Sequence, residues 1–151
     1  MPLDADAGRV LVSHEFSLSI HNRDGAMLLS LPPARAAALR DRDLVAVDGA
    51  TLRHYDAFSG NVLHEWRLPT ERTGRRCANP GFFCSDGGDL VLEDVARGRV
   101  AYVFGGSVHV LRLVDGRDEV VAAGTLAAFI DEGLVYANAN TLRLIPFEQL
   151  P

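Results

Sequence analysis

Residues 100–110 read VAYVFGGSVHV: an apolar run, a Gly-Gly pair, and a second run in which apolar and polar residues alternate. Gly105 and Gly106 tolerate the positive φ that a tight hairpin turn requires, so this stretch predicts two short antiparallel strands. Three other stretches have the same form: VLVSHEFSLSI at residues 10–20, LVAVDGATLRH at 44–54 and LVYANANTLRL at 134–144. The hairpin is therefore a repeated unit, and a repeat of this kind decides the fold.

The repeat extends beyond the hairpin on both sides. A second turn pair, followed by a further strand, comes after each of the first three hairpins: Asp24-Gly25, Ser59-Gly60 and Asp115-Gly116. An apolar segment precedes the last three hairpins, at residues 36–39, 90–95 and 126–130. The unit is thus four short strands, a to d, joined by short turns, which is the pattern of a β-propeller blade. We predict an all-β fold of propeller-type blades, each of four antiparallel strands.

The spacing of the copies defines the expected domain organisation. The hairpins begin at residues 10, 44, 100 and 134, so they are 34, 56 and 34 residues apart. The longer interval holds an insertion at residues 70–88, which has the composition of a surface loop. We predict a single domain over residues 1–151, with repeats at approximately 1–32, 33–69, 89–123 and 124–151.

The two outer copies are expected to be incomplete. Residues 4–10 align with residues 94–100, so the chain is predicted to start inside strand a, and the last copy lacks strand d. This gives about 3.5–4 blades, whereas propellers have roughly four to eight. Three arrangements remain open: the C-terminal part of a larger ring, which we favour, two copies that complete one ring, or an unusually small propeller.

Residues 33–42 are the only run rich in helix-forming residues, chiefly alanine. The repeat places this run at strand a, where small side chains suit the crowded innermost position of a blade. We therefore predict a strand here and not a helix.

Composition excludes some classes of protein. The chain has a formal net charge of −5, and all of its 15 basic residues are arginine. A general nucleic-acid binder needs a dense positive surface, so we expect no nucleic-acid partner. No apolar run approaches the roughly 18 residues that span a bilayer, and the first residues have no signal-peptide pattern, so we predict no membrane span and no signal peptide in this chain.

Residues 52–66, LRHYDAFSGNVLHEW, resemble the repeat of pyrroloquinoline-quinone-type (PQQ-like) propellers. Those repeats have a tyrosine or leucine, an aspartate, then Thr-Gly or Ser-Gly, and an apolar strand with a tryptophan; Trp66 lies about two positions beyond the family's usual tryptophan. The C-terminal half, at residues 108–118, 133–136 and 143–147, resembles a group of uncharacterised actinobacterial propeller proteins. Both resemblances imply a PQQ-like or WD40-like propeller, and neither implies a particular activity.

The insertion holds two candidate features. Cys77 and Cys84 are six residues apart, which allows either a local disulfide or two free thiols; a disulfide would indicate an extracytoplasmic protein. The same segment is basic and aromatic, and such residues are frequent in binding hot spots. It is either a partner-binding loop or a loop whose phenylalanines pack on a blade edge; its residues are Arg72, Arg75, Arg76, Phe82 and Phe83.

The remaining polar residues form no catalytic pattern. The five histidines are scattered and lack metal-ligand spacing, so we predict no metal site. Six acidic residues flank strand a and are expected to be solvated turn residues, with a cation-binding channel mouth as the alternative: Asp41, Asp43, Glu93, Asp94, Asp131 and Glu132. We predict no catalytic residue and no cofactor.

The predicted function is a non-catalytic propeller repeat module that binds a protein or a ligand. The alternatives are a PQQ-dependent dehydrogenase-like enzyme and a fragment of a larger propeller enzyme. Open blade edges would also permit self-association, because unpaired strands are templates for pairing.

Overall fold

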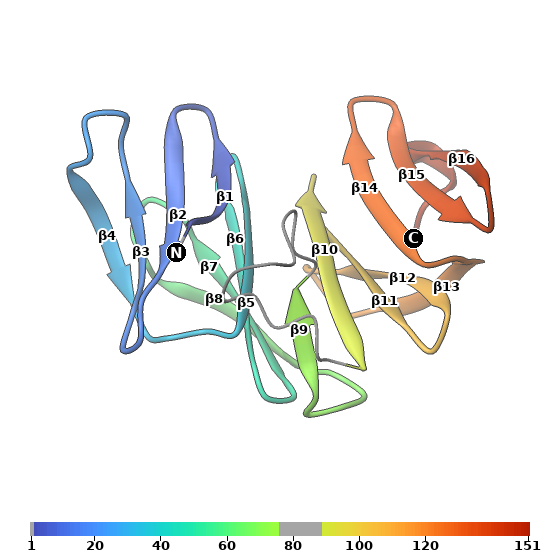
Figure 1. The fold of residues 1–151 in the computed structure, drawn as a ribbon, viewed down its shortest axis with the longest axis horizontal. Coiled ribbons are helices and arrows are strands. Elements are labelled where there is room, and N and C mark those ends of the chain that lie inside the picture. Colours follow the sequence, from blue (N-terminus) through green and yellow to red (C-terminus); the bar gives the residue numbers. More distant parts are fainter. Residues whose placement is uncertain (1, 76–88) are drawn as a thin grey trace.

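A computed structural model describes residues 2–75 and 89–151. The described residues form sixteen β-strands and one short 3-10 helix, η1 (Phe147–Gln149). The strands form four sheets, and each sheet is one propeller-type blade. Figure 1 shows the blades side by side in an open arc, with blade 1 at one end and blade 4 at the other. The predicted all-β propeller-type fold is confirmed.

The strands within each blade, and the blades themselves, are arranged in space in the order in which they occur along the chain. Blade 1 contains β1 (Pro2–Asp6), β2 (Arg9–Ser13), β3 (Leu18–His21) and β4 (Met27–Leu31). Blade 2 contains β5 (Ala36–Arg40), β6 (Asp43–Asp48), β7 (Thr51–Asp56) and β8 (Val62–Arg67). Blade 3 contains β9 (Thr73–Arg75), β10 (Leu90–Ala96), β11 (Arg99–Phe104), β12 (Ser107–Arg112) and β13 (Asp118–Ala123). Blade 4 contains β14 (Leu126–Ile130), β15 (Gly133–Asn138) and β16 (Thr141–Pro146).

Strand a of each blade lies toward the inside of the arc. These strands are β1, β5, β10 and β14, and each contacts strand a of the next blade. The alanine-rich run is a strand as predicted: Ala36, Ala37 and Ala38 in β5 are all buried where neighbouring blades converge. Gly105 and Gly106 adopt φ of 58° and 75°, which explains why glycine occupies both positions of this hairpin turn.

Two details differ from the sequence predictions. Blade 1 is complete, because the short acidic N-terminal segment forms the full strand β1 with a β-bulge between Pro2 and Asp4. Part of the predicted surface loop is a strand: β9 pairs in parallel with β10 on the inner edge of blade 3. The hydroxyl of Thr73 anchors β9 by donating to Gly49 O at 2.9 Å.

Blades 1 and 2 are repeated by blades 3 and 4 at an offset of 90 residues. The strands β5, β6 and β7 correspond residue for residue to β14, β15 and β16. The bulge in β1 recurs at the same offset in β10, between Leu92 and Asp94. The structural unit is therefore a pair of blades, and the chain contains two such pairs.

Three apolar clusters lie between the blades and hold the arc together. One joins blades 1 and 2, the second blades 2 and 3, and the third blades 3 and 4. The first and third are built from equivalent residues: Leu11, Leu18 and Ile20 of blade 1 correspond to Ala101, Val108 and Val110 of blade 3. Burial between blades is the main source of stability in such an arrangement. Within the described residues, no helix is long and apolar enough to cross a membrane.

Candidate functional site

Two partly buried carboxylates, Asp4 and Asp94, join neighbouring blades at their inner strands. The bulge in β10 turns the side chain of Asp94 toward blade 4, where its Oδ2 accepts a hydrogen bond from Phe129 N at 2.7 Å. Asp4 makes the equivalent contact from blade 1 to blade 2, accepting from Leu39 N at 2.9 Å. Each carboxylate thus accepts a hydrogen bond from an N–H group on strand a of the next blade, where that N–H group has no acceptor within its own sheet.

Arg40 connects three blades at the same place. It projects from blade 2, and its Nη2 lies 3.3 Å from the carboxylate of Asp94 in blade 3. Its Nη1 also donates to Phe129 O in blade 4, at 3.5 Å. Burial raises the pKa of Asp94, against the opposing effects of the Phe129 N–H and the Arg40 guanidinium. The prediction that Asp94 is a solvated turn acid is therefore wrong.

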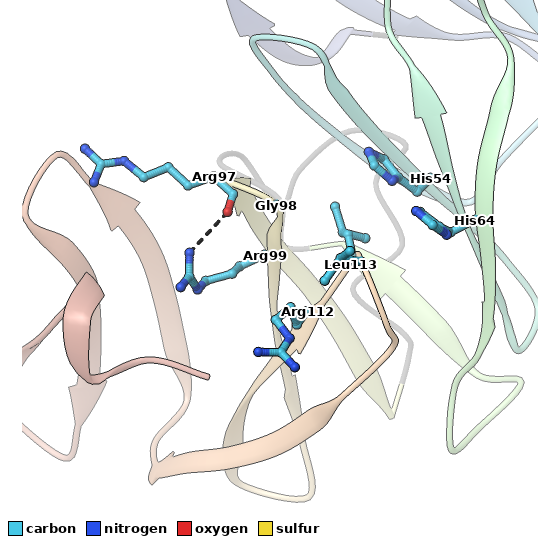
Figure 2. Close-up of a pocket in the computed structure, with 8 residues that line it drawn as sticks. His54, His64, Arg97, Gly98, Arg99, Arg112 and Leu113 are labelled. Atoms are coloured by element: carbon cyan, nitrogen blue, oxygen red, sulfur yellow. Dashed lines mark hydrogen bonds between the residues drawn. The ribbon is translucent and has the colours of Figure 1, made fainter.

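A cleft of about 270 Å³ lies between blades 2 and 3. Its residues come from β7 and β8 of blade 2 and from the two turns of blade 3 that face them. Figure 2 shows the rings of His54 and His64 directed toward Leu113, while the guanidinium groups in the opposite wall point away from the rings. The lining residues are His54, His64, Arg97, Gly98, Arg99, Arg112, Leu113 and Val114.

Asp43 closes one side of the cleft by bonding to both blades. His54 Nε2 donates to Asp43 Oδ1 at 2.7 Å, and Gly98 N donates to Oδ2 at 3.2 Å. His54 is 6% exposed, and its Nδ1 is buried without a hydrogen-bond partner among the described residues. Asp43 therefore holds the imidazole in one orientation and ties it to the backbone of blade 3.

Three rings of blade 2 form a stack beside the cleft. The centroids of His54 and His64 are 5.6 Å apart, and those of His64 and Trp66 are 5.7 Å apart. Trp66 in turn packs against the turn of blade 3 at Gly116, where an added Cβ would lie 2.5 Å from the indole. Trp66, the tryptophan of the PQQ-like stretch, therefore packs onto the following blade. Because Trp66 also stacks on His64, its fluorescence should respond to changes in the cleft.

A second polar group lies in the contact between blades 2 and 3, on the side of blade 3. The ring of His109 stacks on Tyr102 with centroids 4.6 Å apart, and His109 Nδ1 donates to Asp118 at 3.2 Å. The Tyr102 hydroxyl also donates to Asp118. Burial, and then the hydrogen bond to Asp118, raise the pKa of Tyr102, so this phenol stays protonated at any physiological pH.

The other predicted site residues lie in several different places. Arg72 is exposed and lies 3.7 Å from Asp89, and the backbone of Arg75 belongs to β9. Asp41, Asp131 and Glu132 are exposed turn residues, as predicted, and Glu93 is partly buried. The remaining residues of the predicted loop and both cysteines lie outside the described residues: Arg76, Cys77, Phe82, Phe83 and Cys84.

The grouping of the histidines was missed by the sequence prediction. His14 and His21 both contact Ser19, at 3.1 Å and 2.8 Å, and are not scattered. His54 and His64 are direct cross-strand partners in the register of β7 and β8. The Ser59-Gly60 turn alone does not give this pairing, because a β-bulge between His54 and Tyr55 shifts the register so that His54 faces His64. Among the described residues, no group of three or more histidine, cysteine or acidic side chains could hold a metal ion.

Replacing Asp43 with alanine should lower the free energy of unfolding by about 2 kcal/mol, because the Gly98 N–H and the His54 N–H lose their acceptor in a partly buried place. Urea unfolding measures the loss. The matched control is Asp48→Ala, which removes an exposed carboxylate from the same strand, β6. Equal losses for the two variants would contradict the assigned role of Asp43.

Comparisons with known proteins support the fold. No family model and no curated protein matches the sequence. Among solved structures, Hsv2p from Kluyveromyces lactis is similar, with a TM-score of 0.61, 17% identity, and coverage of 88% of this chain and 40% of that one. BamB from Moraxella catarrhalis has a TM-score of 0.58 and 12% identity over 98% of this chain and 46% of that one. Sqt1 from Saccharomyces cerevisiae has a TM-score of 0.56 and 13% identity over 95% and 42%.

These similarities show a propeller-type fold and nothing finer, because the identities are low. The chain spans less than half the length of each of these structures.

Proposed function

We propose that this propeller repeat module is non-catalytic and binds an apolar group with a negative charge in the cleft between blades 2 and 3. That group is either a small ligand or a side chain of a protein partner. The observation that carries the proposal is the cleft itself, which is large enough for an aromatic ring and is walled by His64 on one side and by Leu113 and Val114 on the other.

The charge of the lining determines the kind of ligand. Three arginines and two histidines line the cleft, and the carboxylates of Asp43 and Asp115 are each bonded to lining residues. The arginines have local partners: Arg112 bonds to Asp115, while Arg97 and Arg99 lie over the ring of Phe147 at 4.3 Å and 5.7 Å. These guanidinium groups point away from the histidine rings, so they act on a ligand through their long-range positive charge, which favours a carboxylate over an ammonium group on an otherwise equal ligand.

The absence of a catalytic role is part of the proposal. The polar groups around the cleft are engaged in contacts that join strands and blades: Asp43 with Gly98, and Asp118 with Tyr102. Such groups stabilise the arrangement of the blades, and a reactive group needs to face a substrate instead. We also propose, from residues 52–66, that the blades derive from a PQQ-like repeat; this origin requires no quinone at the cleft.

Phenylacetate should bind this cleft with a dissociation constant on the order of 1 mM, the strength expected for so small a ligand. Trp66 is the only tryptophan in the chain and stacks on His64, so its fluorescence should change with saturation. Phenethylamine, which has a similar body and the opposite charge, should bind several-fold more weakly.

A matched pair of variants locates the site. Val114→Asp puts a negative charge at the mouth of the cleft and should abolish phenylacetate binding, whereas Val120→Asp changes a similarly exposed valine on β13 and should not. Wild-type fluorescence that does not respond to either probe, or equal losses for both variants, would overturn the proposal.

A further inference from the structure

The face of blade 4 that points away from blade 3 is apolar and uncovered. In β14, Ala127 and Phe129 are buried against blade 3, so the alternate side chains point the other way. Leu142 and Leu144 of β16 lie on the same face, through their register with β15, and are 70% and 47% exposed. We call this the end face of blade 4; its residues are Leu126, Ala128, Ile130, Val135, Ala137, Leu142 and Leu144.

The 90-residue repeat shows what such a face does elsewhere in the molecule. The equivalent residues of blade 2 form its contact with blade 3 and are buried: Ala36, Ala38, Val45, Val47 and Leu52. Ala36 pairs with Val47 in blade 2, and the corresponding pair in blade 4 is Leu126 with Ala137, a larger residue opposite a smaller one.

The complementary surface is at the other end of the arc. Val95, Val100 and Tyr102 of blade 3 pack against blade 2, and their equivalents in blade 1 are Ala5, Val10 and Val12. On that side of blade 1, Ser19 is the register partner of Val12 and is covered by His14 and His21, which both contact its hydroxyl. His21, the register partner of Val10, and Met27, the register partner of His21, lie on the same face. We call this the end face of blade 1; Met27 is 62% exposed there.

We propose that two copies of this chain pack end to end, with the end face of blade 4 of each copy on the end face of blade 1 of the other. Both contacts would resemble the packing of blade 2 on blade 3 at strands a to c. The result is a closed ring of eight blades with two-fold symmetry, in which neither end face stays exposed.

The groups at the inner strands agree with this arrangement. At the inner strands, the pair of Arg40 and Asp94 would be replaced by Ile130 and Asp4. Asp4 needs no cation from the second copy, because Leu39 N and Ala5 N already donate to its carboxylate.

The contact would lie on strands a to c of blade 4. In the contact between blades 2 and 3, Trp66 of β8 fills the space at Gly116, and blade 4 has no strand equivalent to β8 among the described residues. Gly25, the equivalent turn residue of blade 1, has no atom within 4 Å of an added Cβ. The open space at Gly25 is thus consistent with a contact restricted to the three inner strands.

Size-exclusion chromatography with light scattering tests the ring. The wild-type chain should have twice the 16.4 kDa mass of one copy. Leu142→Asp and Met27→Arg should each yield a folded protein with the mass of one copy, because each substitution places a charge on one end face and so prevents the contact. Val62→Arg changes a comparably exposed residue on the outer strand of blade 2 and should keep the doubled mass. Circular dichroism checks that each variant is folded.

Mixing the two single-mass variants distinguishes this ring from other dimers. A copy with Leu142→Asp and a copy with Met27→Arg together retain one contact with two unchanged end faces, and the other contact pairs Asp with Arg. The mixture should therefore recover the doubled mass. A wild-type chain of single mass, a higher polymer, a doubled mass that Met27→Arg leaves unchanged, or a mixture that stays at single mass would each overturn the proposal.

Discussion

Asp94→Ala should lower the free energy of unfolding by about 3 kcal/mol, which for a chain of this length is a fall in melting temperature of roughly 6–12 °C. The carboxylate accepts from Phe129 N and Val95 N, at 2.7 Å and 2.8 Å, and faces the guanidinium of Arg40. Its removal leaves a buried N–H group between blades without an acceptor, and each such group costs about 1–3 kcal/mol. Differential scanning calorimetry measures the change.

The equivalent variant in blade 1 separates the two contributions. Asp4 accepts from Leu39 N and Ala5 N in the same geometry, while the ion pair of Arg40 is with Asp94. Asp4→Ala should thus lose only the stabilisation that comes from the backbone hydrogen bonds. It should unfold at a temperature between those of wild type and Asp94→Ala. Asp24→Ala, at an exposed turn, should melt like wild type. If Asp94→Ala also melts like wild type, the inner-strand carboxylates do not join the blades.

Gly116→Ala should lower the free energy of unfolding by about 3 kcal/mol. Gly116 has a φ of 72°, which costs an L-residue about 1–2 kcal/mol. In addition, the new Cβ would lie 2.5 Å from the indole of Trp66, so the tryptophan has to move away from blade 3. Urea unfolding gives the loss, and a red shift of tryptophan emission reports the displaced ring.

Gly25→Ala is the matched control for this prediction. Gly25 occupies the same turn position in blade 1 with a φ of 81°, and nothing lies within 4 Å of an added Cβ. This variant therefore keeps the backbone cost of about 1 kcal/mol and lacks the collision. Equal losses at Gly116 and Gly25 would show that Trp66 does not depend on this close approach to blade 3.

The repeat made most of the fold predictable from the sequence. Tight-turn pairs such as Gly105-Gly106 mark hairpins by local chemistry, and their regular spacing identifies blades without any tertiary information. β9 was not predictable in the same way. Thr73 is held by pairing with the edge of β10 and by a hydrogen bond to Gly49 O, and both partners are remote in the chain.

The candidate site was much less predictable than the fold. Asp94 and Asp43 are turn-flanking acids in the sequence, and their roles come from neighbouring blades that place Phe129 N and Gly98 N within reach. The cleft itself requires two blades to be packed at a particular distance, which no local pattern encodes. The cross-strand pair of His54 and His64 was not predictable either, because a β-bulge beside His54 shifts the register that the Ser59-Gly60 turn alone would give.

The most direct test of the proposed binding site is a two-dimensional amide NMR titration of the wild-type chain with phenylacetate. We predict saturable shifts centred on the two walls of the cleft, at His64 in β8 and at Gly98, Leu113 and Val114 in blade 3, with little change at the distant turn of Gly25. Shifts centred elsewhere, or no saturable shifts at all, would contradict the assignment of the cleft between blades 2 and 3 as the binding site.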